Sequence, residues 1–174
     1  KLFWTCEGFN PEKRANWVQV ASSVLDGNMA IVPYGRGKHI AGIELSGDGD
    51  VTQSNRKWTL NGTGSFVPTP AIQDGKVYVV GDRGHVACLD VKTGKKIWDG
   101  KFPKHRASYY ASPTVADGKI YAPREDGVIM VASISDGFQF LSENNMGERI
   151  IATIVPVRDR LLIRGENHLF CITK

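Results

Sequence analysis

The chain repeats a set of turn residues at a fixed interval. Asp74-Gly75 is followed 43 residues later by Asp117-Gly118. The same interval separates two further glycines of each copy, namely Gly84 from Gly127 and Gly94 from Gly137. Asp-Gly dipeptides between short apolar runs are typical of two-residue hairpin turns. Matching turns at this interval indicate a repeated supersecondary unit.

Between its turns, the central copy contains four short runs with the composition of β-strands. They cover residues 71–72, 76–80, 85–90 and 95–98. Four short antiparallel strands in about 40 residues, repeated along the chain, predict an all-β fold in which each unit is one blade of a β-propeller. The nineteen glycines and eight prolines are spread between the apolar runs, which also favours a protein of short strands and tight turns.

Further copies lie on both sides. The upstream copy has its first turn at Asp26-Gly27 and an expanded turn at residues 46–55, and the last copy has its first turn at Asp159-Arg160. None of these units could bury its apolar face alone, so we expect them to stack into one domain spanning residues 1–174. The predicted blades cover residues 5–60, 61–100, 101–142 and 143–174.

The two ends of the chain are unmatched. Residues 1–4 match Lys95–Trp98 and are predicted to be the fourth strand of a flanking or closing blade, whereas the last copy stops after its third strand. Because propellers avoid open sheet edges, three arrangements remain open. We favour the C-terminal half of an eight-bladed propeller. The alternatives are a small ring with residues 1–4 as its clasp, and two copies pairing head to tail into eight blades.

Charge and cysteine content exclude several classes of protein. The net charge is +4 with a pI near 9.0, but the basic residues are scattered, so we expect no nucleic-acid partner.

No run of 18 apolar residues exists, so no transmembrane segment is predicted, and no signal peptide is seen. Cys6, Cys88 and Cys171 lack zinc-finger spacing. Residues 47–55 resemble a calcium loop without its bidentate Glu, so we expect no metal site.

One motif carries a resemblance to a known family. The segment Cys88-x-Asp90-x-x-Thr93-Gly94-Lys95-x-x-Trp98 resembles the tryptophan-docking signature of the pyrroloquinoline quinone (PQQ)-like repeat, with Cys in place of the usual Ala. The resemblance implies that Thr-Gly makes the turn, that the acidic side chain ties strand to turn, and that the indole packs between blades. We therefore expect Trp98 to be buried between its own blade and a neighbour. The structural docking motif comprises Cys88, Asp90, Thr93, Gly94 and Trp98.

The same resemblance implies an eight-bladed propeller and two possible functions. One is a non-catalytic module that binds protein or glycan partners, similar to outer-membrane assembly lipoproteins built from this repeat. The other is a fragment of an exported PQQ-dependent oxidoreductase. Either implies a periplasmic or extracellular location. Quinoprotein dehydrogenases use a disulfide of adjacent cysteines over the quinone, and none exists in this sequence, so we expect no cofactor.

A candidate binding face follows from the loops that a propeller places on one side, namely the connections between blades and the turns between second and third strands. Arginines interleaved with aromatic residues occur in these loops, which is typical of a recognition surface. No G-x-S-x-G, H-E-x-x-H or P-loop motif occurs, so no catalytic residue is predicted. The candidate face comprises Arg14, Trp17, Arg36, Arg83, His85, His105, Arg106, Tyr109, Tyr110, Arg124 and Arg149.

Overall fold

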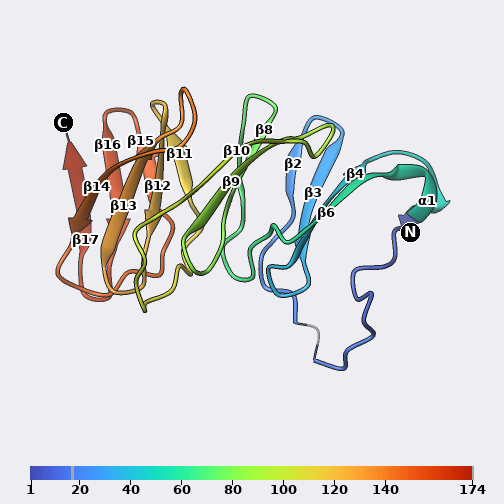
Figure 1. Ribbon diagram of the computed structural model, residues 1–174, viewed down its shortest axis with the longest axis horizontal. Helices are drawn as coiled ribbons and strands as arrows, with labels where there is room; N and C mark the ends of the chain where they lie inside the picture. Colours follow the sequence, from blue (N-terminus) through green and yellow to red (C-terminus); the bar gives the residue numbers. More distant parts are fainter. Residues whose placement is uncertain (17, 174) are drawn as a thin grey trace.

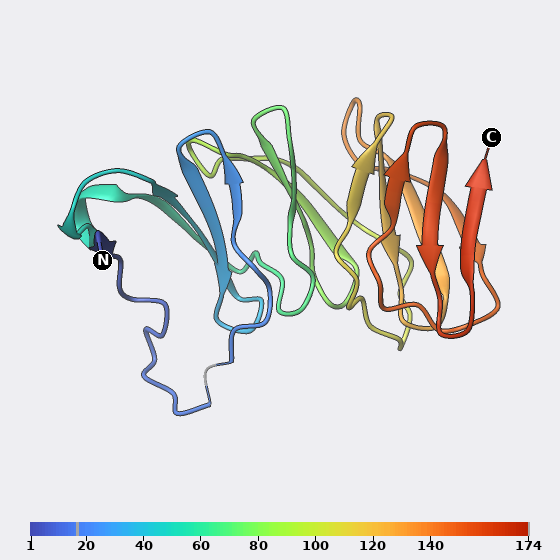
Figure 2. The same ribbon diagram turned by 180° about the vertical axis from the view of Figure 1, so that it is seen from behind.

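Four antiparallel sheets stand side by side along the molecule (Figure 1; Figure 2 from behind). This computed structural model describes residues 1–16 and 18–173. The first sheet contains β2 (Val24–Asp26), β3 (Met29–Tyr34), β4 (His39–Glu44) and β6 (Arg56–Asn61). The second contains β7 (Ala71–Gln73), β8 (Lys76–Val80), β9 (His85–Asp90) and β10 (Lys96–Lys101).

The other two sheets repeat this order. The third contains β11 (Thr114–Ala116), β12 (Lys119–Pro123), β13 (Val128–Ser133) and β14 (Gln139–Asn145). The last contains β15 (Val155–Val157), β16 (Arg160–Arg164) and β17 (Leu169–Thr173), and it has three strands among the described residues. The predicted all-β fold of four-stranded antiparallel blades is therefore confirmed.

The first turn of each inner sheet has the predicted conformation. Asp74 and Gly75 have φ values of 51° and 71°, and Asp117 and Gly118 have 51° and 66°, so both residues of each loop are left-handed, as a type I′ hairpin requires. The outer sheets differ by one residue from the prediction. Their loops are residues 27–28 and 158–159, because Asp26 pairs with Met29, and Val157 with Arg160.

The N-terminal segment joins the expanded turn of the first sheet. β1 (Trp4–Thr5) pairs in parallel with β5 (Gly49–Asp50), and the single helical turn α1 (Thr52–Asn55) follows. β17 lies at the opposite end of the row (Figures 1 and 2). Residues 1–4 therefore do not clasp the last sheet of their own chain, and the small closed ring is not formed, because four sheets form an open arc too wide for one chain's ends to meet.

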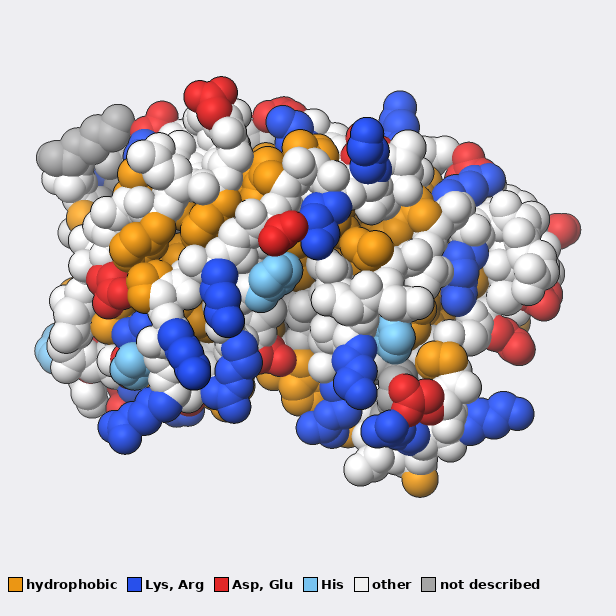
Figure 3. Space-filling model, in the orientation of Figure 1, with side chains coloured by type: hydrophobic (Ala, Val, Ile, Leu, Met, Phe, Trp, Pro, Cys, Tyr) orange, Lys and Arg blue, Asp and Glu red, His pale blue; other side chains and the backbone are white. Residues whose placement is uncertain are grey.

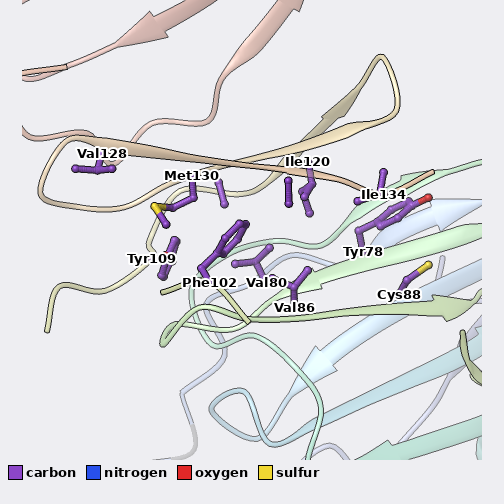
Figure 4. Close-up of a cluster of buried hydrophobic side chains, with 12 residues drawn as sticks. Tyr78, Val80, Val86, Cys88, Phe102, Tyr109, Ile120, Val128, Met130 and Ile134 are labelled. Carbon is purple, nitrogen blue, oxygen red and sulfur yellow. The ribbon is translucent and has the colours of Figure 1, made fainter. Parts of the chain in front are cut away.

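The cores lie between the sheets, which pack face to face. Apolar side chains of the first and second sheets form one cluster, those of the second and third form another (Figure 4), and those of the third and last form a third. A smaller cluster covers the far side of the first sheet, where Cys6 and Phe9 pack on Ala41 and Ile43. Among the described residues, no helix has the length and apolar character needed to cross a membrane.

Candidate binding face and tryptophan dock

The turns between second and third strands and the connections between sheets lie on one side of the molecule, the lower edge in Figure 1. Antiparallel pairing places these loops together. In the first sheet it brings Tyr34, His39 and Asn61 into one row at the end of the sheet, so the turn from β3 to β4 and the connection that follows β6 start from the same edge. We call this side the loop face. Lys and Arg side chains gather along the same edge in the space-filling view (Figure 3).

Hydrogen bonds join each connection to the turn of the sheet that follows it. The amide of Val67 donates to Asp82 Oδ1 at 3.2 Å, and the amide of Ser108 donates to Glu125 Oε1 at 2.9 Å. The amide of Tyr109 also donates to the Asp82 carbonyl at 3.1 Å, so the next connection returns to the same turn. These bonds satisfy loop backbone that would otherwise depend on water, and they make the loop face an ordered surface.

The last turn of the loop face is organised around Glu148. Its Oε1 accepts from the His168 amide at 2.9 Å, and its Oε2 accepts from the Asn167 side chain at 3.2 Å. Burial alone would raise the pKa of Glu148, but the hydrogen bonds from His168 and Asn167 outweigh it and hold the pKa below its usual value. A carboxylate that collects several donors in this way fixes the turn through electrostatic hydrogen bonds.

Most of the predicted arginines reach the surface of the loop face. Arg36 lies over the Phe66 ring at 4.7 Å, and Arg83 Nη1 donates to the Arg106 carbonyl at 3.0 Å. Arg149 faces the Glu125 carboxylate at 3.9 Å. Arg14 forms an ion pair with Glu12 in the N-terminal loop, and Tyr110 is exposed. Trp17 lies outside the described residues.

The structure places the other predicted residues differently. Tyr109 is 2% exposed and stacks on Phe102 with ring centroids 5.8 Å apart (Figure 4), and burial raises its pKa to about 12. Arg124 is 4% exposed and makes a two-pronged pair with Asp126, at 2.8 and 3.0 Å. Tyr109 and Arg124 therefore support the loop face from below. His85 and His105 lie at its edge, 3.8 Å from Asp99 and 3.5 Å from Asp126.

The sequence motifs gave no role to the carboxylates that hold the loops in place. Asp82 and Glu125, which receive the connections, are 43 residues apart, so the repeat interval itself could have identified them. Glu148 and Asp126 have no such signal, because Glu148 lies in a connection and Asp126 follows the repeated position. The repeated acidic position marks where the connections are held, and the exposed arginines lie around it.

The docking motif of the second sheet forms the expected turn. Asp90 Oδ1 accepts hydrogen bonds from the Thr93 amide at 2.8 Å and from its hydroxyl at 2.7 Å. These two bonds lower the pKa of Asp90, since they favour the ionised carboxylate. Gly94 has φ 67° and closes the turn through its amide, which donates to the Asp90 carbonyl at 2.9 Å.

The indole that docks on this turn is Trp58 of the preceding sheet. Trp58 Nε1 donates to the Val91 carbonyl at 2.9 Å. A Cβ atom at Gly94 would lie 2.4 Å from the indole, and one at Gly42, directly across the first sheet, would lie 2.3 Å from it. Trp58 is therefore held between two glycines, one from each of two neighbouring sheets.

Trp98 adopts a looser arrangement than the motif led us to expect. It is half-buried between Tyr78 and Phe138, with ring centroids 6.0 and 6.2 Å away. Its cross-strand partner is Cys88, where Trp58 has Gly42. Cys88 carries a side chain where Gly42 has none, and Trp98 packs on Phe138 of the third sheet.

The Arg124–Asp126 pair makes stability depend on pH. Burial would raise the pKa of Asp126, but the hydrogen bonds and charge of Arg124 outweigh it, so the pKa lies below its usual value. Such a carboxylate stabilises the fold above its unfolded pKa, and this stabilisation is lost as the pH falls through the folded value. Asp126→Asn leaves Arg124 buried without its ion pair. We expect it to lower the free energy of unfolding by about 1–2 kcal/mol near pH 7, a modest loss because Asp126 is partly exposed and solvent screens the pair.

Urea unfolding of the wild type and of Asp126→Asn at about pH 7 and about pH 3 measures this effect. The difference in unfolding free energy between the two proteins should be smaller at the lower pH. An equal difference at both values would show that Asp126 acts through packing, independently of its charge.

Comparison with known proteins places the chain in a family. The sequence model of the family described as outer membrane protein assembly factor BamB matches residues 48–140, more than half of the chain, from β5 into β14. The chain belongs to this BamB-like family of PQQ-like repeat propellers. No curated protein matches the sequence.

Solved structures share the fold of this BamB-like chain. BamB from Moraxella catarrhalis superposes with a TM-score of 0.68 at 16% identity, over 91% of this chain and 46% of its own. The computationally designed protein Ika4 superposes with a TM-score of 0.74 at 14% identity, over 99% of this chain and 98% of its own. Quinohemoprotein alcohol dehydrogenase from Comamonas testosteroni superposes with a TM-score of 0.58 at 20% identity, over 74% of this chain and 21% of its own. The chain thus spans less than half the length of the natural proteins it resembles.

Proposed function

We propose that this chain is part of a non-catalytic propeller that binds a protein partner through its loop face. The observation that carries the proposal is that hydrogen bonds hold every described connection between sheets against the next turn. Around these anchor points Arg83, Arg106, Arg149 and Tyr110 stay accessible. Loops whose backbone is already ordered lose little conformational entropy on binding, and arginine and tyrosine are enriched at protein interfaces.

The family adds support for the kind of partner. Its description names the assembly of outer membrane proteins, and the Moraxella protein that shares the fold is a BamB. We therefore propose that the partner belongs to such an assembly system and that the intact protein works in the periplasm. A basic loop face suits a partner with exposed carboxylates, because opposite charges speed association and orient the complex.

The second candidate function, a quinoprotein oxidoreductase, is favoured by the shared fold with the Comamonas dehydrogenase. The cysteines do not fit the quinone site that this relationship implies. Cys88 is buried in the core between the second and third sheets, Cys6 is half-buried beside Arg56, and Cys171 is exposed on the last strand. We therefore propose that this segment holds no quinone cofactor.

In-cell photocrosslinking in a bacterium that carries the gene tests the binding proposal. A photoreactive residue in place of Arg83, Arg106 or Arg149 is expected to give one defined crosslinked protein. The same residue at Lys76 or Lys92, which lie near the turns of the opposite side, should not. Arg83→Glu with Arg106→Glu should then abolish the crosslink formed at position 149, whereas Lys76→Glu with Lys92→Glu should leave it.

Two results would contradict the proposal. One is equal crosslinking on both sides of the molecule. The other is a visible absorbance change with a raised melting temperature when pyrroloquinoline quinone and calcium are added to the purified chain, which would support the oxidoreductase.

A further inference from the structure

The connections between sheets carry an apolar residue at one repeated position of the loop face. Val67 stands two residues before Thr69, and Tyr110 stands two residues before Ser112, 43 residues further along the chain. The Thr69 amide donates to Ser112 Oγ at 3.0 Å, so the two connections run side by side at this point. Val67 and Tyr110 therefore occupy equivalent places in neighbouring connections.

The connection before the first sheet has the same arrangement. Val20 stands two residues before Ser22, and the Ser22 amide donates to Thr69 Oγ1 at 3.0 Å. The amide of Ala21, between them, donates to the Phe66 carbonyl at 3.0 Å. Val20 is therefore held beside the next connection at the position that Val67 and Tyr110 occupy in theirs.

Ile151 completes the series in the connection to the last sheet. It stands two residues after Arg149, as Tyr110 stands two residues after Ser108. The carbonyls of Arg149 and Ser108 are equivalent, because each accepts an amide from the turn of the sheet that follows, at 3.0 and 2.9 Å. We call the four residues the apolar row, namely Val20, Val67, Tyr110 and Ile151.

The apolar row is accessible although its neighbours in the chain are buried. Val20 is 49% exposed, Tyr110 38% and Ile151 47%. On either side of Tyr110, both Tyr109 and Ala111 are buried in the molecule. The second and third sheets, which this connection joins, are each packed between two other sheets, so the exposure of Tyr110 belongs to the loop face itself. Apolar side chains gathered within a polar surface mark interaction sites.

The accessible charge around the apolar row is positive. Arg36, Arg83 and Arg106 are exposed on the loop face. The carboxylates of Asp82 and Glu125 are only partly accessible there and already accept amide hydrogen bonds from the connections. An apolar centre with arginine around it is the composition of the core of a protein interface, and it suits a partner with exposed carboxylates.

A cavity of about 150 Å³ opens at one end of the apolar row. Arg149 Nη2 is 3.9 Å from the Glu125 carboxylate, which is longer than a hydrogen bond, and Arg164 is exposed at the end of β16. Two guanidinium groups and one carboxylate meet at this cavity, so it suits an acidic side chain. The residues that line it are Arg149, Ile151, Arg164, Gly165 and Glu166.

We propose that the apolar row is the centre of the loop-face interface and that its partner is a protein segment presenting apolar side chains next to an aspartate or glutamate. The proposal rests on the function proposed above and specifies how the partner is recognised. Its apolar side chains pack along the row, and its carboxylate enters the cavity between Arg149 and Arg164. Burial of the apolar side chains supplies affinity, and the charged contact fixes the orientation.

In-cell photocrosslinking from position 106 tests the apolar row, because Arg106 lies on the loop face outside the row. Tyr110→Ser combined with Ile151→Ser is expected to reduce the crosslinked fraction about tenfold, since exposed aromatic and aliphatic residues at the centre of an interface carry much of its affinity. Ile97→Ser combined with Leu141→Ser is the matched control. These two residues are 48% and 45% exposed on fourth strands, away from the connections, so the crosslink should be unchanged.

The carboxylate contact has its own pair of variants. Arg164→Gln is expected to reduce the same crosslink about fivefold, because it removes one of the two guanidinium groups at the cavity. Arg160→Gln is the control, since Arg160 begins the strand that Arg164 ends and lies on the opposite side of the molecule. An equal effect of both variants, or no effect of Arg164→Gln, would contradict the proposed contact.

The outcomes separate this inference from the function on which it rests. A crosslink that persists undiminished in the Tyr110→Ser, Ile151→Ser variant overturns the apolar row and leaves the loop face as a binding surface. A wild-type background without any crosslink from position 106 contradicts the loop-face function itself. A crosslink to lipid or to a second copy of this chain overturns the proposed class of partner. Thermal melting of the purified variants verifies folding, and the single variants Tyr110→Ser and Ile151→Ser replace the double variant if it melts early.

Discussion

Trp58→Ala is expected to lower the free energy of unfolding by about 3 kcal/mol, toward the lower end for a truncated tryptophan because the indole is half-buried. The change removes the packing of the indole between Gly42 and Gly94 and leaves the Val91 carbonyl without its donor. Gly42 and Gly94 have no side chains that could move into the space left by the indole. A cavity therefore remains between the first and second sheets.

Urea unfolding followed by circular dichroism measures this loss at one fixed protein concentration. Trp98→Ala is the matched control, because Trp98 occupies the same position of the next sheet but packs on Phe138, with Cys88 across the strand. Its expected loss is smaller, about 2 kcal/mol. A loss at Trp98 equal to or above that at Trp58 would contradict the assignment of Trp58 as the docked indole.

Gly127→Ala is expected to destabilise the chain by at least about 3 kcal/mol. A Cβ atom at Gly127 would lie 2.0 Å from the carbonyl oxygen of Glu148, which is backbone and cannot rotate away. Gly127 also has φ 89°, which a residue with a side chain rarely adopts. The substitution would push the connection to the last sheet away from its turn and disturb the hydrogen bond from the Met146 amide to the Gly127 carbonyl.

Gly147→Ala separates the two contributions. Gly147 is next to Glu148 and has a similar φ of 78°, but nothing lies within 4 Å of the position of its Cβ. It should therefore show only the backbone strain, about 1 kcal/mol. Thermal melting of both variants beside the wild type measures the difference. Equal losses would mean that the contact with Glu148 relaxes and that only the backbone conformation matters at Gly127.

The sequence by itself determined the repeat, the strands and the central turns. These features depend on contacts close along the chain: Asp74-Gly75 and Asp117-Gly118 favour left-handed turns in any context, and the alternation of residues 76–80 favours a strand. The Asp90–Thr93 turn was predictable for the same reason, since its hydrogen bonds span only three residues. The interval between Asp82 and Glu125 was also present in the sequence and would have indicated where the connections are held.

The tertiary structure alone decided which tryptophan docks, which loop-face residues stay exposed and where the N-terminal strand lies. Trp58 and Trp98 share a motif position, and only the residue across the sheet, Gly42 or Cys88, distinguishes them. Tyr109 and Arg124 have the composition of surface loops, yet both side chains are buried. Each of these outcomes depends on packing between segments far apart in the chain, which local preference and periodicity do not encode.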